Sequence, residues 1–267
     1  RDEGLGTLNE FFTRETVGRI GPASAHLVTA INVFAHVPEI GEFAENVRRI
    51  LRPDGVFIAE VQYLRDTVEQ LSFDNCYLEH VLYFTLISLE RVLARAGLYV
   101  IDAERVDTHG GSLRVYANTG EEYWSTAPAR IKFEEEKMGL DKLETYQEFA
   151  LKVEGAGCQL RERLLAIKAD GKIIFGYGAA AKSTTILNYC DIGPDILECI
   201  IDDSPLKQGT WSPGVHIPIV GPEELRWSRP DVILVLAWNH LETIKARTSH
   251  LGAEYIVPVE ALCRPSD

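Results

Sequence analysis

The sequence predicts a two-part α/β protein, and three observations lead to this fold class. Short apolar runs rich in branched residues alternate with helical patterns up to residue 119. A stretch rich in Glu, Lys and Leu follows, and a second alternation begins at Lys172. We therefore expect domains at residues 1–119 and 171–267, joined by a helical connector at 120–170.

The first part has the order strand, helix, strand, helix, strand, strand. Apolar spacing marks its helices, Gly97 ends the second helix, and a polar Arg-Pro-Asp-Gly sequence marks a turn. The last two strands are expected to form an antiparallel edge of the sheet. The predicted elements are strand 26–33, helix 40–51, turn 52–55, strand 56–61, helix 86–96 and strands 99–106 and 112–117.

The second part opens with a glycine motif between a strand at 172–175 and a helix at 179–189. Gly176 to Ala181 fits G-x-G-x-x-A with a tight turn at 176–178, and Asp202 ends the next strand, where a ribose-binding acid lies in dinucleotide sites. Such glycines let backbone N–H groups approach a phosphate at a helix N-terminus. On the pattern alone, a phosphate loop and a turn that binds nothing are equally supported. A further buried strand is expected at 231–237.

Composition excludes several classes of protein. The formal net charge of -13 argues against a nucleic-acid backbone as the main partner. Five scattered cysteines argue against a disulfide framework and a structural zinc site, so no metal site is expected in this chain. The longest apolar run, 232–238, is too short to span a bilayer, and no signal peptide is visible. These features predict a cytoplasmic protein without a membrane partner.

Three polar segments are candidates for chemistry. Tyr77-Leu78-Glu79-His80 places a hydroxyl, a carboxylate and an imidazole within four residues, which suits proton transfer. On spacing alone, a helix entry with a capping Glu and a surface His is the favoured alternative. His36 follows a predicted strand end, where α/β proteins bind ligands, although a lone His is more often structural. Thr108-His109-Gly110-Gly111-Ser112, followed by Arg114, is by default a hairpin turn and otherwise a phosphate contact.

Taken together, the motifs resemble the sugar C-methyltransferase family, which includes the 3-C-methyltransferases of deoxysugar biosynthesis. The resemblance covers nearly the whole chain, and its Tyr-x-Glu-His and His-Gly-Gly-Ser blocks are the most specific. It implies the later part of a Rossmann-like class I methyltransferase domain, followed by a second Rossmann-like domain that binds substrate or nucleotide. The blocks are Asn32-Val33-Phe34-Ala35-His36-Val37-Pro38, Leu51-Arg52-Pro53-Asp54-Gly55-Val56, Tyr77-Leu78-Glu79-His80-Val81-Leu82-Tyr83-Phe84, Thr108-His109-Gly110-Gly111-Ser112-Leu113-Arg114, Gly176-Tyr177-Gly178-Ala179-Ala180-Ala181-Lys182 and Asp202-Asp203-Ser204-Pro205-Leu206-Lys207-Gln208-Gly209.

The resemblance also implies an activity and a set of roles. The reaction would be S-adenosylmethionine-dependent methylation of the carbon next to the ketone of a nucleotide diphosphate keto sugar. His80 would be the base, oriented by Glu79, while Tyr77 and His36 would donate hydrogen bonds to sugar oxygens. The residues implied for the cofactor are Phe11, Ala30 and Asn32. The residues implied for the substrate are His109, Ser112, Arg114, Gly176, Tyr177, Gly178, Lys182 and Lys207.

Features of the family that precede these blocks are absent from this sequence. The family begins with a cysteine-ligated zinc domain and a glycine loop for S-adenosylmethionine, so the chain is predicted to be N-terminally truncated, with zinc only in the missing part. A chain without that loop is expected to bind the cofactor weakly and to methylate poorly. Two alternatives stay open: an NAD-dependent oxidoreductase that uses the Gly176 motif with Asp202, and a non-catalytic protein that binds nucleotide sugars.

Overall fold

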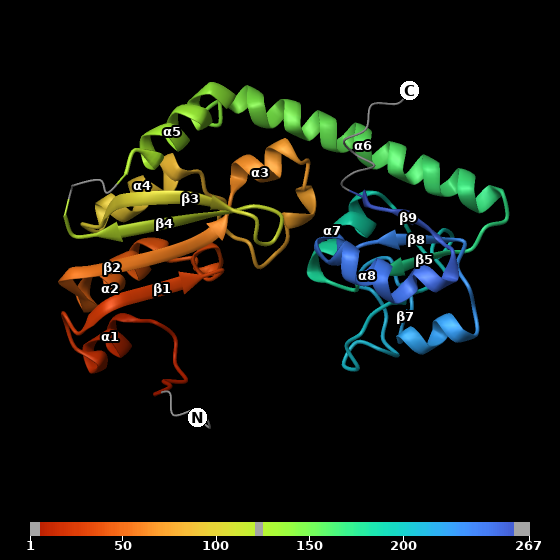
Figure 1. Cartoon of the computed structure of the whole chain (residues 1–267), viewed down its shortest axis with the longest axis horizontal. Coiled ribbons are helices and arrows are strands. Elements are labelled where there is room, and N and C mark those ends of the chain that lie inside the picture. Colours follow the sequence, from red (N-terminus) through yellow and green to blue (C-terminus); the bar gives the residue numbers. More distant parts are fainter. Residues whose placement is uncertain (1–5, 121–124, 259–267) are drawn as a thin grey trace. The chain divides into compact units, whose positions relative to one another are not determined.

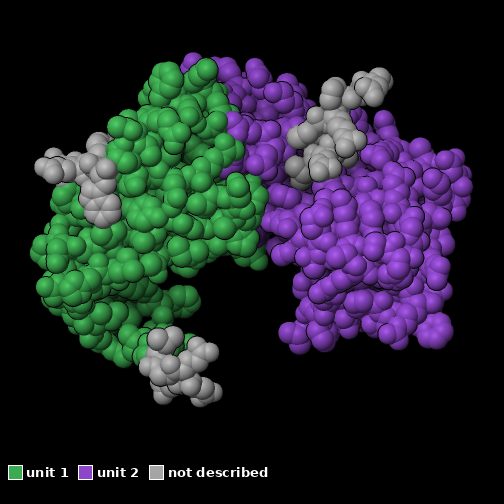
Figure 2. Space-filling view, viewed as in Figure 1, with its two compact units in different colours: residues 1–65, 79–141 green, residues 66–78, 142–267 purple. Residues whose placement is uncertain are grey.

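The computed structural model describes residues 6–120 and 125–258, which form two compact units (Figures 1 and 2). Unit 1 comprises residues 1–65 and 79–141, and unit 2 comprises residues 66–78 and 142–267. The helices of the expected connector are divided between the units: α5 (Ala127–Met138) belongs to unit 1 and α6 (Leu143–Ala169) to unit 2. Residues 121–124, at the start of the expected connector, lie outside the described residues.

Unit 1 contains a four-stranded sheet with the order β1-β2-β4-β3. β1 and β2 are parallel, whereas β4 is antiparallel to both β2 and β3, which confirms the predicted antiparallel edge. Apolar side chains of α2, α4 and α5 join those of the sheet in one core. The elements are α1 (Arg14–Ile20), β1 (Ala25–Ile31), η1 (Phe34–His36), α2 (Ile40–Ile50), β2 (Leu51–Gln62), α4 (Leu86–Arg95), β3 (Tyr99–Val106), β4 (Ser112–Asn118) and α5.

The turn predicted at residues 52–55 is wrong, because β2 continues through it as an irregular strand. Ala25 pairs with Leu51 and Leu27 with Val56, so the polar residues between them bulge out of the ladder. A Cβ on Gly55 would lie 2.9 Å from the carbonyl oxygen of Ala25. The glycine therefore permits the close approach of the two strands.

The start of α4 is held by a buried carboxylate from another helix. Glu135 of α5 accepts hydrogen bonds from the backbone N–H groups of Leu86 at 2.6 Å and Ile87 at 3.1 Å. It also accepts one from the hydroxyl of Tyr63 at 2.8 Å. Burial raises the pKa of Glu135 above its usual value, and the three donors oppose that shift. The contact satisfies orphan donors at the helix start and links α4 to α5.

Unit 2 contains a five-stranded parallel sheet with the order β7-β6-β5-β8-β9. Both faces are covered: Val232 and Leu234 of β8 lie in one apolar cluster, and Ile233 and Val235 lie in another. This two-sided burial explains the continuous apolar runs in the sequence. The elements are α6, β5 (Ile174–Tyr177), α7 (Ala181–Tyr189), β6 (Ile200–Ile201), β7 (Ile219–Val220), η3 (Pro222–Arg226), β8 (Val232–Val235), η4 (Trp238–His240), α8 (Leu241–Thr248), η5 (Ser249–Leu251) and β9 (Glu254–Ile256).

A segment that precedes α4 in the chain is built into unit 2. It comprises residues 66–78, with most of α3 (Leu64–Glu69) and all of η2 (Phe73–Asn75). Leu71 and Phe73 join the core formed with α6 and α7. The ring of Phe73 lies 4.9 Å from that of Tyr189, measured between centroids. The sequence pattern gave no sign of this exchange between units.

Within the described part of the chain, no helix is both long and apolar enough to cross a membrane. Among the same residues, no group of three or more His, Cys, Asp and Glu side chains could hold a metal ion. Four cysteines there are free thiols, and burial raises the pKa of Cys190 and of Cys199 to about 12. Cys263 lies outside the described residues.

Candidate active site

Two histidines that the sequence singled out lie together in unit 1. His36, in η1, places its Nδ1 atom 2.7 Å from the carbonyl oxygen of Glu79. The rings of His36 and His80 have centroids 4.9 Å apart. The structure thus brings together three of the four residues predicted for catalysis, from segments more than forty residues apart in the sequence.

The hydrogen bond fixes the tautomer of His36. A carbonyl oxygen can only accept, so Nδ1 of His36 carries the proton that is donated to Glu79. In the neutral ring, Nε2 then keeps its lone pair. The backbone that carries His36 is anchored by Phe34 and Ala35, which are buried. The predicted orienting role of Glu79 was assigned to its carboxylate, whereas this contact uses its backbone, and its side chain is exposed.

His80 is half-buried beside the aromatic ring of Tyr83. The two rings meet edge to face with centroids 6.4 Å apart. Tyr77, the fourth predicted catalytic residue, is half-buried and lies in unit 2.

A polar cluster in unit 2 holds the segment that precedes Tyr77. The indole N–H of Trp238 donates to Oδ2 of Asp74 at 2.6 Å, and Nζ of Lys182 lies 4.9 Å from the centre of the Trp238 ring. Asp74 is buried, and this burial raises the pKa of its carboxyl above the usual value. Burial also lowers the pKa of Lys182, and the charge of Asp74 opposes that shift. The hydroxyl of Thr185 adds a hydrogen bond of 3.5 Å to the Cys76 carbonyl.

Trp238→Phe is expected to loosen this segment. Phenylalanine keeps an aromatic ring at this position but has no N–H group, so the buried Asp74 loses a short hydrogen bond. We expect this loss to lower the stability of the segment by about 1–3 kcal/mol. Hydrogen exchange followed by mass spectrometry should show faster exchange in peptides covering residues 70–78. Trp227→Phe is the matched control, since Trp227 is 83% exposed. Equal exchange in both variants would show that the indole does not hold the segment.

The His-Gly-Gly-Ser block forms the tight connection between β3 and β4. His109 has a φ of +52°, a conformation uncommon for residues with a side chain, and Gly110 and Gly111 follow with positive φ. Ser112 is buried and donates to the Thr108 carbonyl at 3.1 Å. The default interpretation of this block, a hairpin turn, is therefore confirmed.

Arg114 is engaged by a carboxylate that the sequence analysis did not single out. Its Nε and Nη2 atoms donate to Oε2 of Glu60 at 3.0 and 2.8 Å, and the Thr108 hydroxyl donates to Oε1 at 2.7 Å. Burial alone would raise the pKa of Glu60, but the Thr108 and Arg114 donors bring it below the usual value. A lone Glu within the apolar run of β2 was the available signal.

The three residues predicted to bind the cofactor differ in how exposed their side chains are. Phe11 is 88% exposed, whereas Ala30 is 3% exposed and lies in the core. Asn32 is exposed, with a φ of +53°, and follows the carboxyl end of β1. Phe11 lines a pocket of about 390 Å³ together with Val33, the residue after Asn32. The other lining residues are Glu10, Phe12, Thr13, Val37, Glu39, Glu42 and Phe43.

The glycine motif of unit 2 differs from its prediction in where the turn lies. Gly176 and Tyr177 belong to β5 and are buried, so the turn predicted at 176–178 is wrong and begins only at Gly178. A Cβ on Gly176 would lie 3.0 Å from a methyl group of Leu236, and one on Gly178 would lie 2.4 Å from the Cβ of Ala237. Both glycines thus permit close packing against the region that follows β8.

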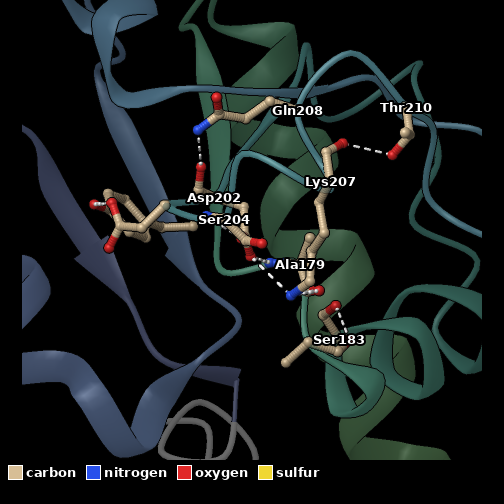
Figure 3. Close-up of polar contacts among 10 residues, drawn as sticks. Ala179, Ser183, Asp202, Ser204, Lys207, Gln208 and Thr210 are labelled. Atoms are coloured by element: carbon tan, nitrogen blue, oxygen red, sulfur yellow. Dashed lines mark hydrogen bonds and ion pairs between the residues drawn. The ribbon is translucent and has the colours of Figure 1, made fainter.

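The loop after Gly178 already holds a carboxylate from its own chain (Figure 3). Oδ2 of Asp202 accepts the backbone N–H of Ala179 at 2.7 Å, and Oδ1 accepts that of Ser204 at 2.9 Å. Nζ of Lys207 donates to the Ala179 carbonyl at 2.8 Å and lies 3.4 Å from Oδ2 of Asp202. Asp202, predicted to bind a ribose in the oxidoreductase alternative, therefore takes the place at the loop that an anionic ligand would occupy.

Comparison with known proteins places the chain in a family. Residues 107–259, more than half of the chain, match the family model described as the C-methyltransferase C-terminal domain. The chain belongs to the C-methyltransferase family. Residues 10–103 match a second model, described as a methyltransferase domain. These matches confirm the family resemblance and the α/β, Rossmann-like fold class.

A C-methyltransferase relative matches nearly the whole length of this chain. C-methyltransferase NovU from Streptomyces niveus is 37% identical over 265 residues, which cover 97% of this chain and 63% of NovU. The chain thus spans less than two thirds of that relative.

Similar solved structures cover less of the chain. A complex of the Haloferax volcanii Trm112 methyltransferase activator with a putative methyltransferase has a TM-score of 0.33 and 14% identity, covering 39% of this chain and 58% of that chain. Burkholderia thailandensis 1,6-didemethyltoxoflavin-N1-methyltransferase, solved with 1,6-didemethyltoxoflavin and S-adenosylhomocysteine, has a TM-score of 0.29 and 22% identity, covering 36% of this chain and 44% of that chain.

Proposed function

We propose that the chain takes part in S-adenosylmethionine-dependent methylation of the carbon next to the ketone of a nucleotide-linked keto sugar. Family membership supports a C-methyltransferase, and the motifs around His36, His80 and His109 support a keto sugar as the substrate class. The paired imidazoles of His36 and His80 are the observation that carries the proposal. The family matches give no support to the NAD-dependent alternative. The carboxylate of Asp202 also accepts the backbone N–H of Ala179, in the glycine-motif loop where that alternative would place a phosphate.

The histidine pair suits the removal of a proton next to a ketone. A ketone acidifies the neighbouring C–H bond, and the enolate oxygen that forms needs a donor. Because Nδ1 of His36 is committed to the Glu79 carbonyl, His36 donates to such an oxygen only from a protonated Nε2. Two positive rings 4.9 Å apart repel, so the pair favours one charged donor beside one neutral base. The family resemblance assigns the base to His80 and the donor to His36.

The pocket beside Phe11 fits the proposed cofactor in chemistry and size. Its volume of about 390 Å³ is in the range of small-molecule sites. It combines the aromatic rings of Phe11, Phe12 and Phe43, which suit an adenine or a cation, with carboxylates that suit ribose hydroxyls. S-adenosylmethionine supplies an electrophilic methyl group when bound. Phe11 and the backbone at Asn32–Val33 are the proposed contacts, while the buried Ala30 shapes the core beneath.

Deuterium exchange tests the proposed chemistry without requiring methyl transfer. The chain is incubated in D₂O with nucleoside diphosphate-linked 4-keto-6-deoxyhexoses, and proton NMR follows the C–H positions beside the ketone. Exchange faster than in buffer alone is the expected result. Exchange at the buffer rate for all sugars, in the presence of demonstrated sugar binding, would favour the non-catalytic binding protein. Oxidation of NADH by the same sugars, seen at the nicotinamide absorbance, would favour the oxidoreductase.

A further inference from the structure

The segment that carries Tyr77 is part of unit 2, although the chain enters unit 1 two residues later. Residues 66–78 belong to unit 2, and Glu79 begins the next part of unit 1. Unit 1 holds its own side of this junction through the carbonyl of Glu79, which accepts a hydrogen bond from His36. The position of Tyr77 therefore depends on contacts within unit 2.

One face of α7 supplies most of these contacts. The ring of Tyr189, the last residue of the helix, lies 4.9 Å from that of Phe73, measured between centroids. The hydroxyl of Thr185 donates to the carbonyl of Cys76 at 3.5 Å. Lys182, near the start of the helix, completes a spacing of i, i+3 and i+7, which places the three side chains on the same face.

The charges of Lys182 and Asp74 meet at the indole of Trp238. The indole N–H donates to Oδ2 of Asp74 at 2.6 Å, and Nζ of Lys182 lies 4.9 Å from the centre of the ring. Asp74 is 1% exposed, and within the described part of the chain its Oδ1 atom has no hydrogen-bond partner. Burial raises the pKa of Asp74 and lowers that of Lys182, and each charge opposes the shift of the other. The two charges therefore stabilise each other in a buried setting.

We propose that Lys182 is a positioning residue for Tyr77: paired with Asp74 across the Trp238 indole, it holds the segment from which Tyr77 reaches the substrate. This role replaces the direct substrate contact that the family resemblance implied for Lys182. The ammonium group is directed at groups of its own chain, an aromatic ring and a buried carboxylate. The inference rests on the proposed function and on the predicted hydrogen bond from Tyr77 to a sugar oxygen.

Hydrogen exchange tests the pair without requiring catalysis. Lys182→Met keeps an unbranched stem over the indole, and Asp74→Asn keeps an oxygen for the indole N–H, so each removes one charge. Each variant should exchange about tenfold or more faster in peptides covering residues 70–78, because one buried charge loses its partner. The double variant should exchange no faster than either single variant. Lys152→Met, at an exposed lysine of α6, is the matched control. Equal exchange in Lys182→Met and Lys152→Met, or additive effects in the double variant, would overturn the pairing.

Deuterium exchange into the keto sugar tests whether Lys182 acts through Tyr77. Tyr77→Phe and Lys182→Met should each slow this exchange by about tenfold, as expected for one lost hydrogen bond to the substrate. In the Tyr77→Phe background, Lys182→Met should cause no further loss, because the hydroxyl that it positions is already gone. Losses that multiply would overturn the positioning role, since a direct substrate contact or a general loss of fold gives that result. Sugar exchange at the buffer rate in the wild-type chain would count against the proposed function, while exchange of the 70–78 amides still decides whether Lys182 holds the segment.

Discussion

Glu135→Ala is expected to lower the free energy of unfolding of unit 1 by about 2–4 kcal/mol. The carboxylate is fully buried and receives the N–H groups of Leu86 and Ile87 and the hydroxyl of Tyr63. Alanine leaves those three donors without their partner in a buried setting. The gain from no longer burying a carboxylate offsets only part of this loss. Urea unfolding, with hydrogen exchange of the α4 amides as the probe of unit 1, measures the effect.

Two further variants separate this effect from a general loss of helix stability. Glu136→Ala is the matched control, because Glu136 is the exposed neighbour in the same helix and should change stability by less than about 0.5 kcal/mol. Tyr63→Phe should cost about 1 kcal/mol, since it removes one of the three hydrogen bonds. A Glu135→Ala variant no less stable than Glu136→Ala would show that the carboxylate does not hold α4.

Glu135 should also make the free energy of unfolding of unit 1 depend on pH, and the raised pKa gives the sign of this dependence. Because the pKa of Glu135 is raised above the usual 4.5, the folded state binds the proton more tightly than the unfolded state. This contribution to stability is fully present below pH 4.5 and is lost as the pH rises through the raised pKa. Glu135→Gln cannot titrate, so the stability of the wild-type chain relative to this variant should fall as the pH rises across that window. A constant difference would contradict the raised pKa.

His80→Ala is expected to slow deuterium exchange beside the ketone by about 10²–10⁴, the range for one positioned base. The fold should persist, because the half-buried His80 stands outside the apolar core of unit 1. His36→Ala should also slow exchange, since it removes the imidazole that the Glu79 carbonyl holds and that is proposed to donate to the enolate oxygen.

The two histidine variants are compared with His26→Ala, which removes an exposed imidazole from β1 in the same unit. His26→Ala should exchange at the wild-type rate. If His80→Ala retained full exchange, the proton would be removed by another group. If His36→Ala alone lost it, the two roles would have to be interchanged.

Much of the fold followed from local patterns. Alternating apolar runs located β1, β3 and β8 to within a few residues, and Gly97 marked the end of α4. Local patterns failed where long-range pairing decided the structure. The bulge at Gly55 depends on the approach of β1, and the chain at Gly176 stays extended because β5 pairs on both sides with β6 and β8. Neither contact has a signature in its own segment.

The candidate site was predictable in its residues and not in its contacts. The sequence indicated His36 and His80 separately, but only the fold places their rings together. It also indicated the Gly176 motif and Asp202 as a nucleotide site, whereas the carboxylate of Asp202 folds back onto the N–H of Ala179.

Transfer of a labelled methyl group tests the central claim most directly. The 267-residue chain, in excess over the keto sugar, is given millimolar S-adenosylmethionine with a ¹³C-methyl group, so that weak cofactor binding does not limit the outcome. The account predicts that ¹³C appears in the sugar, on the carbon next to the ketone, and that His80→Ala abolishes this signal. Label on an oxygen or nitrogen of the sugar, or label on carbon that survives in His80→Ala, would contradict it.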